Sequence, residues 1–167
     1  ISTSGITLQN TIIDGNLYLT EGIGTGNATL KNVRVKGATK VAGGGDNSII
    51  IIDSDLGSIT VNVPDNHRVR LVAEGTTSIG TTNIKTPAII EEGELTGTGF
   101  NDVILQVAPG ATVRLLGDFR DVNVETPEVQ LDIQKGTVQN LTLAPATQGT
   151  TINLASDANI ETFTTHS

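Results

Sequence analysis

The 167-residue chain contains no cysteine, methionine or tryptophan, and it has only one tyrosine and three phenylalanines. Without cysteine, a disulfide framework and a cysteine-ligated metal site are both excluded. No apolar run approaches the roughly 20 residues that a membrane-spanning helix needs. The hydrophobic residues, 37% of the chain, are mostly isoleucine, valine and leucine, a composition that favours strands over helices.

Charge is also scarce, and it is mainly of one sign. Charged residues make up 17% of the chain, and the formal net charge is −8. Nucleic-acid binding and attachment to anionic lipid both depend on basic residues, so this balance argues against both kinds of partner. A modest negative charge instead helps to keep an extended β protein in solution.

A repeat of about twenty residues dominates the sequence. Residues 6–19, 28–41 and 49–61 read ITLQNTIIDGNLYL, ATLKNVRVKGATKV and IIIIDSDLGSITV, the last with one residue deleted. The alignment defines mainly apolar columns, which are Leu8, Leu30 and Ile51; Ile13, Val35 and Leu56; Leu17, Thr39 and Ile59; and Leu19, Val41 and Val61. Looser versions of the unit begin at Val69, Ala88, Val113, Leu131 and Ile152. The chain is therefore built from roughly eight similar units.

Short strands with alternating apolar and polar residues, at a fixed repeat length, are typical of a β-solenoid. Stacking at about 4.8 Å per coil would turn each inward column into a continuous core. We therefore predict an all-β fold, a single-stranded right-handed parallel β-helix of about eight coils with almost no helix. It would cover residues 1–167 as one domain. Because the chain begins with Ile1 rather than methionine, we expect a fragment or module of a larger protein.

Two further columns are expected at bends of the coil. One aligns Asn10, Asn32 and Asp53, and the other aligns Gly15, Gly37 and Gly57. In the first column, the side chains can form hydrogen bonds along the stack. In the second, glycine would allow a positive φ at little cost.

Three acidic residues, Glu21, Asp46 and Asp65, occupy equivalent loops of consecutive coils. Stacking would bring them to one edge of the solenoid, beside the carbonyl groups of glycine-rich backbone. Carboxylates and carbonyls are the ligands that a hard cation such as Ca²⁺ prefers. The sequence therefore indicates a candidate calcium site at this edge, and the alternative is that these acids are simply solvated.

Polar residues on the outward side of the same coils form a candidate ligand face. Tyr18, Lys40 and Thr60 align in one outward column, and Asn62 lies in the next. A flat face with one aromatic ring and several hydroxyl, amide or ammonium groups can contact a sugar chain. An ordinary solvated β face is the alternative interpretation of these residues.

Two segments carry a resemblance to a known family: ITLQNTIIDGNLYLTEGIGTGNATLKNVRVKGATKVAGGG and VRLVAEGTTSIG. They resemble right-handed β-helix modules of Gram-positive surface proteins, which often occur next to S-layer homology domains. The nearest named group is the family-54 carbohydrate-binding modules, found attached to a cell-surface β-1,3-glucanase. The resemblance is clearest over residues 5–80, in the hydrophobic columns and N-x-x-x-x-G turns.

The resemblance implies a non-catalytic, extracellular module associated with the cell surface. Such a module would adhere to β-glucan, xylan or chitin-like polysaccharide, with calcium as a stabiliser and other domains of the parent protein as partners. No sugar-contacting residue is carried over from the family. Two alternatives stay open, because a fold does not determine a function: a structural spacer or adhesin rod, and a polysaccharide lyase or glycoside hydrolase.

An enzyme would need a cleft in which acids and bases converge. The Asp53 and Asp55 pair could act on a glycosidic bond, but the corner column explains Asp53 better. Glu91, Glu92 and Glu94 could bind a cation, and we expect them rather to be solvated loop acids. The only histidines are His67 and His166, with no serine in a nucleophile context. We therefore predict that the chain is not an enzyme.

Overall fold

Almost every stretch of alternating apolar and polar residues forms a strand in the computed structural model, which describes residues 1–166. The strands are β1 (Ile6–Ile13), β2 (Leu17–Leu19), β3 (Ala28–Val41), β4 (Ile50–Ile52), β5 (Asp55–Val61), β6 (Val69–Gly75), β7 (Ser78–Ile84), β8 (Ala88–Leu95), β9 (Gly99–Leu105), β10 (Thr112–Leu116), β11 (Phe119–Val124), β12 (Gln130–Leu143), β13 (Thr151–Leu154) and β14 (Ala158–Thr165). Within those residues the only helical element is the 3-10 turn η1 (Glu21–Ile23). No helix in this part of the chain has the length and hydropathy of a membrane span.

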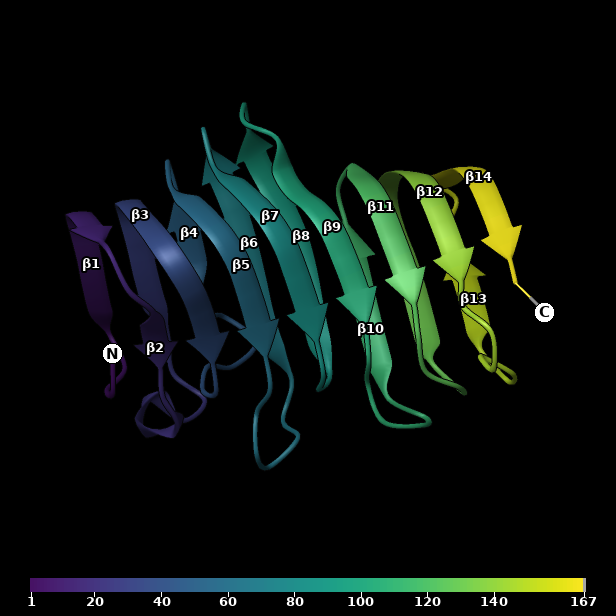
Figure 1. Cartoon of the computed structure of the whole chain (residues 1–167), viewed down its shortest axis with the longest axis horizontal. Coiled ribbons are helices and arrows are strands. Elements are labelled where there is room, and N and C mark those ends of the chain that lie inside the picture. Colours follow the sequence, from purple (N-terminus) through teal and green to yellow (C-terminus); the bar gives the residue numbers. More distant parts are fainter. Residues whose placement is uncertain (167) are drawn as a thin grey trace.

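Each turn of the chain adds one strand segment to each of two parallel faces. The first face contains β1, β4, β6, β8, β10 and β13, and the second contains β2, β5, β7, β9, β11 and β14. The long strands β3 and β12 pass round a corner and belong to both faces, and the end of β1 passes round the same corner. Figure 1 shows the strands side by side along the long axis, with the two termini at opposite ends.

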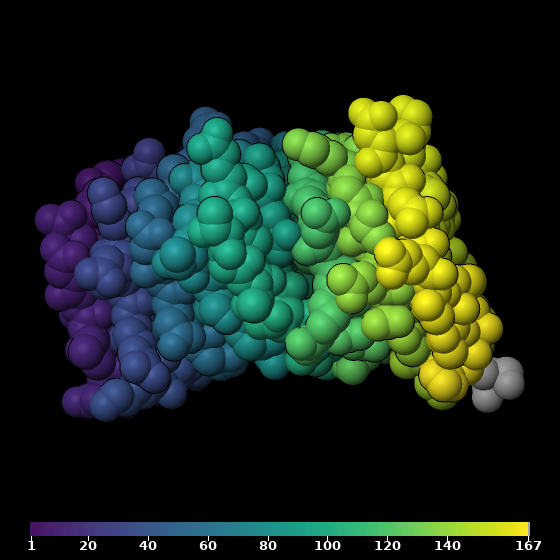
Figure 2. Space-filling model, turned by 90° about the horizontal axis from the view of Figure 1, so that it is seen from above, coloured from purple at the N-terminus to yellow at the C-terminus, as the bar shows by residue number. Residues whose placement is uncertain are grey.

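The turns stack in chain order, since the colours in Figure 2 pass from purple to yellow along the molecule. All strand pairings are parallel, and the strands account for eight turns. The predicted parallel β-helix of about eight coils is therefore confirmed.

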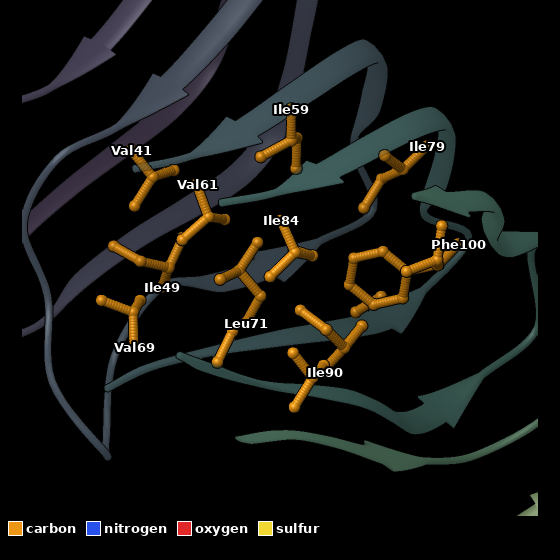
Figure 3. Close-up of a cluster of buried hydrophobic side chains, with 14 of the residues drawn as sticks. Val41, Ile49, Ile59, Val61, Val69, Leu71, Ile79, Ile84, Ile90 and Phe100 are labelled. Carbon is orange, nitrogen blue, oxygen red and sulfur yellow. The ribbon is translucent and has the colours of Figure 1, made fainter. Parts of the chain in front are cut away.

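The apolar columns of the repeat lie in register. Leu8 pairs with Leu30, and Leu30 pairs with Ile51, as the alignment predicts. The other three columns are in register as well. Side chains from both faces, such as Leu71 and Ile84, meet in one continuous hydrophobic core (Figure 3). Burial of these aliphatic side chains supplies the main stabilisation of the stack, at about 25 cal/mol per Å² of apolar surface.

Two phenylalanines stack in adjacent turns of one inward column. Phe100 in β9 and Phe119 in β11 hold equivalent positions in the strand register. Their ring centroids lie 6.2 Å apart, with an interplanar angle of 28°. Both side chains are buried, so two of the chain's few aromatic rings stabilise the interior of the solenoid.

The asparagine column forms one corner, as predicted. Asn10, Asn32 and Asp53 all adopt positive φ, at 53°, 52° and 49°, which turns the chain from the first face towards the second. The Asn32 side-chain amide donates to Oδ1 of Asn10 at 2.9 Å. Gly75 follows in the same column, with φ at 63°. Asparagine, aspartate and glycine share this corner because they tolerate the left-handed conformation best.

The reason predicted for the glycine column is wrong. Gly15, Gly37 and Gly57 are not among the residues with positive φ. At Gly37, a Cβ atom would instead lie 2.5 Å from the carbonyl oxygen of Gly15. Gly37 is therefore needed for space and not for its conformational range, whereas a Cβ atom at Gly15 or Gly57 would meet nothing closer than 4.0 Å.

Substitutions at Asn32 test the corner. We expect Asn32→Val to be less stable than Asn32→Gly by about 1–2 kcal/mol, because only glycine accepts the left-handed φ without steric cost. Both variants lose the ladder hydrogen bond, so this loss cancels in the comparison. Urea unfolding followed by circular dichroism measures the difference. Equal stability of the two variants would show that backbone conformation does not select the corner residue.

The last turn has no further coil on its outer side within the described chain. Phe163 pairs with Leu141 and so occupies an inward column, yet its exposed fraction is 53%. Leu154, on the other face of the same turn, is 50% exposed. Full burial of an inward column therefore requires neighbouring coils on both sides.

Candidate functional site

The predicted ligand face lies on the second face of the solenoid, near its N-terminal end. Tyr18 pairs with Lys40, and Lys40 pairs with Thr60, so the three residues occupy one column across β2, β3 and β5. They alternate with the buried residues Leu19 and Val41, which forces their side chains outward. The column is therefore fixed by the same alternation that builds the core.

This surface is hollowed into a groove with a volume of about 620 Å³. We call it the Tyr18 groove; its lining residues are Tyr18, Leu19, Thr20, Glu21, Gly22, Lys40, Val41, Ala42, Thr60, Asn62 and Lys85. The structure thus brings together all four residues predicted to face a ligand. The volume falls in the range of about 300–1,000 Å³ that is usual for ligand pockets.

Lys85 is a lining residue that was not predicted from the sequence. It lies just after β7, where its backbone N–H donates to the carbonyl oxygen of Val61 at 2.9 Å. This register places it beside Asn62, one turn further along the stack. Extending the repeat alignment by one unit, through the pairing of Val61 with Ile84, would have found it.

The lysines of the Tyr18 groove differ from the arginines in their pairing. Each of the five arginines forms an ion pair with an acid, at Arg34, Arg68, Arg70, Arg114 and Arg120. Among the lysines, Lys36 is the only one that does so within residues 1–166. Lys40 Nζ lies 5.6 Å from the centroid of the Tyr18 ring, and Lys85 is exposed. The groove therefore presents two ammonium groups that no carboxylate in the described chain neutralises.

Further along the second face, charged side chains are already paired with one another. Arg120 donates to Asp102 at 2.8 Å and to Asp121 at 2.7 Å. Asn140 donates to the other carboxylate oxygen of Asp121 at 2.9 Å. The hydrogen bond from Arg120 holds the pKa of the Asp121 carboxyl below its usual range. The charged groups of this network pair with one another, whereas the lysines of the Tyr18 groove are free to bind a ligand.

The three acids of the predicted calcium site do not all converge. Glu21 and Asp65 line one small pocket of about 190 Å³, where Asp65 contacts the ring of His67. Asp46 instead receives two hydrogen bonds from Arg68, at 2.8 and 2.9 Å. These bonds lower the pKa of Asp46.

In the described part of the chain, no three histidine or acidic side chains gather as a metal site would require. Two of the three predicted donors share a pocket, and the third is bound to a guanidinium group. Calcium binding at this edge stays a prediction.

Glu92 does not lie in solvent, so that expectation is wrong for this residue. It is half-buried within β8, where Oε1 accepts from the backbone N–H of Phe100 at 3.0 Å. Oε2 accepts from the backbone N–H of Asp118 at 3.1 Å. Burial raises the pKa of Glu92 to about 7, and the nearby Asp118 carboxylate acts in the same direction. The Glu92 carboxylate fills the space that a side chain at Gly99 would need.

The other acids singled out in the sequence have structural partners or face solvent. Glu91 pairs with Arg70 at 2.6 Å, and Glu94 is exposed. Asp53 accepts from the backbone N–H of Thr76 at 3.0 Å, as its place in the corner column predicts. Asp55 lies 3.6 Å from Arg34. Asp53 and Asp55 therefore each have a local role in the corner.

Comparisons with family models, with curated proteins and with solved structures found no match to this chain. The candidate site is therefore interpreted from its own residues.

Proposed function

We propose that this chain is a non-catalytic carbohydrate-binding module that adheres to polysaccharide at an extracellular, cell-surface location. The observation that supports this best is the Tyr18 groove, in which the four residues of the predicted ligand face line one open depression. A groove that crosses several coils suits a polymer better than a compact small molecule. The resemblance to family-54 modules points to the same class of ligand.

The groove offers three kinds of contact to a sugar chain. The Tyr18 ring is 49% exposed and provides an apolar surface with a polar end. Thr60 and Asn62 supply a hydroxyl and an amide that can donate to and accept from sugar hydroxyls. Because these side chains stand on stacked strands, their spacing of about 4.8 Å per coil is rigid. Such preorganisation lowers the entropic cost of binding.

Pull-down with insoluble β-glucan, xylan and chitin tests this proposal. We expect at least one of them to retain the wild-type protein, and Asn62→Ala to reduce retention. Asn159→Ala is the matched control, because Asn159 is an exposed asparagine on β14 at the far end of the molecule. Retention by none of these three polymers, together with no binding to the acidic polymer tested below, would contradict the proposal and favour the structural spacer. Release of reducing ends or unsaturated sugars would contradict the non-catalytic assignment.

Thermal unfolding with calcium or with a chelator tests the metal prediction. If calcium stabilises the loop edge of Glu21 and Asp65, the chelator lowers the melting temperature of the protein. An unchanged melting temperature would contradict calcium binding.

A further inference from the structure

We infer that the Tyr18 groove selects acidic polysaccharides, in which carboxylate-bearing sugar units meet Lys40 and Lys85. This inference rests on the proposed function and specifies its ligand. Charge is distributed unevenly over the molecule. The chain has a net charge of −8, yet the groove is lined by two lysines and one acid, Glu21.

The two lysines are available to a ligand. Neither forms an ion pair within the described chain, whereas every arginine does. Lys40 and Lys85 are both exposed, so an incoming carboxylate can reach them without breaking an existing ion pair. Lys40 lies over the Tyr18 ring, 5.6 Å from its centroid. The ammonium group therefore covers one face of the ring and lies close to a sugar unit that contacts Tyr18.

The spacing of the lysines fits a polymer. Lys40 belongs to the second turn and Lys85 to the fourth, so their backbones lie about 10 Å apart along the stack. That separation is too large for one carboxylate to contact both ammonium groups closely. It suits two carboxylates carried by different sugar units of one chain. Thr60 and Asn62, from the intervening turn, lie between them and face the sugar hydroxyls.

Binding to polygalacturonate and to its fully methyl-esterified form tests this inference. The two polymers share a backbone, and only the first carries free carboxylates. Isothermal titration calorimetry at low and at high salt measures the affinity for each. We expect the acid form to bind about tenfold more tightly than the ester, since each charged hydrogen bond contributes to the difference. Salt should reduce the difference, because exposed charges are screened.

A matched pair of variants separates the groove from overall charge. Lys40→Gln/Lys85→Gln should abolish the preference for the acid form. Lys31→Gln/Lys135→Gln removes the same charge from two exposed lysines outside the groove and should leave the preference unchanged. An equal loss in both double variants would overturn the inference, because it would indicate non-specific attraction.

The remaining outcomes distinguish the inference from the proposed function. If acid and ester bind equally, the groove does not distinguish charged from neutral sugar units, so the inference fails and the proposed function stands. If neither form binds while β-glucan, xylan or chitin retains the protein, the inference again fails and the proposed function again stands. If no polysaccharide binds at all, both fail together.

Discussion

Replacing Phe100 by alanine is expected to lower the free energy of unfolding by about 3–5 kcal/mol. Phe100 is fully buried in the fifth turn and stacks on Phe119 in the sixth. Truncation removes the buried ring and leaves a cavity that stacked coils cannot close, because their spacing is fixed by hydrogen bonds between strands. The loss is a large part of the roughly 5–15 kcal/mol that typically separates folded from unfolded protein. Urea unfolding followed by circular dichroism measures it.

Phe163→Ala is the control for this substitution. It removes the same side chain from the same kind of strand, but Phe163 is 53% exposed in the last turn. Much of its ring is already in contact with water, so we expect a change well below that of Phe100→Ala. A comparable loss in both variants would mean that position along the stack has no influence on core packing.

The contribution of Glu92 to the free energy of unfolding is expected to fall as the pH rises from 4.5 to 7. The pKa of this residue is about 7 in the folded chain, above the ordinary value of 4.5. Between these values the folded chain holds a proton that the unfolded chain has released. The stabilisation is therefore fully present below pH 4.5 and is lost as the pH rises through about 7. Its size is about 1–3 kcal/mol.

Glu92→Gln isolates this dependence, because glutamine cannot ionise. We expect its free energy of unfolding to change less between about pH 4.5 and pH 8 than that of the wild type. Glu94→Gln is the matched control, since Glu94 is exposed and two residues away, and it should keep the wild-type slope. Asp46 and Asp121 have pKa values lowered below 3.8, so they titrate outside this range. Parallel slopes for wild type and Glu92→Gln would contradict a buried, protonated Glu92.

The candidate site was predictable wherever it follows from the strand register. The column of Tyr18, Lys40 and Thr60 depends only on the repeat length and on alternation, and both can be read from the sequence. The ion pair of Asp46 with Arg68 was not predictable in this way. Asp46 and Asp65 lie in loops, where strand register does not fix the side chains, and Arg68 in the next turn donates to Asp46 at 2.8 Å.

Sequence alone determined the architecture, because a fixed repeat of alternating apolar residues can bury its inward columns only by stacking coils. It also determined the corner of Asn10, Asn32 and Asp53, since few residues accept a left-handed backbone. Tertiary structure decided which polar side chains meet. The hollow of the Tyr18 groove, the burial of Glu92 and the ion pair of Asp46 depend on distances across neighbouring turns. A repeat pattern specifies which positions are adjacent. Charge interactions and close packing between neighbouring turns then determine the orientation of the side chains.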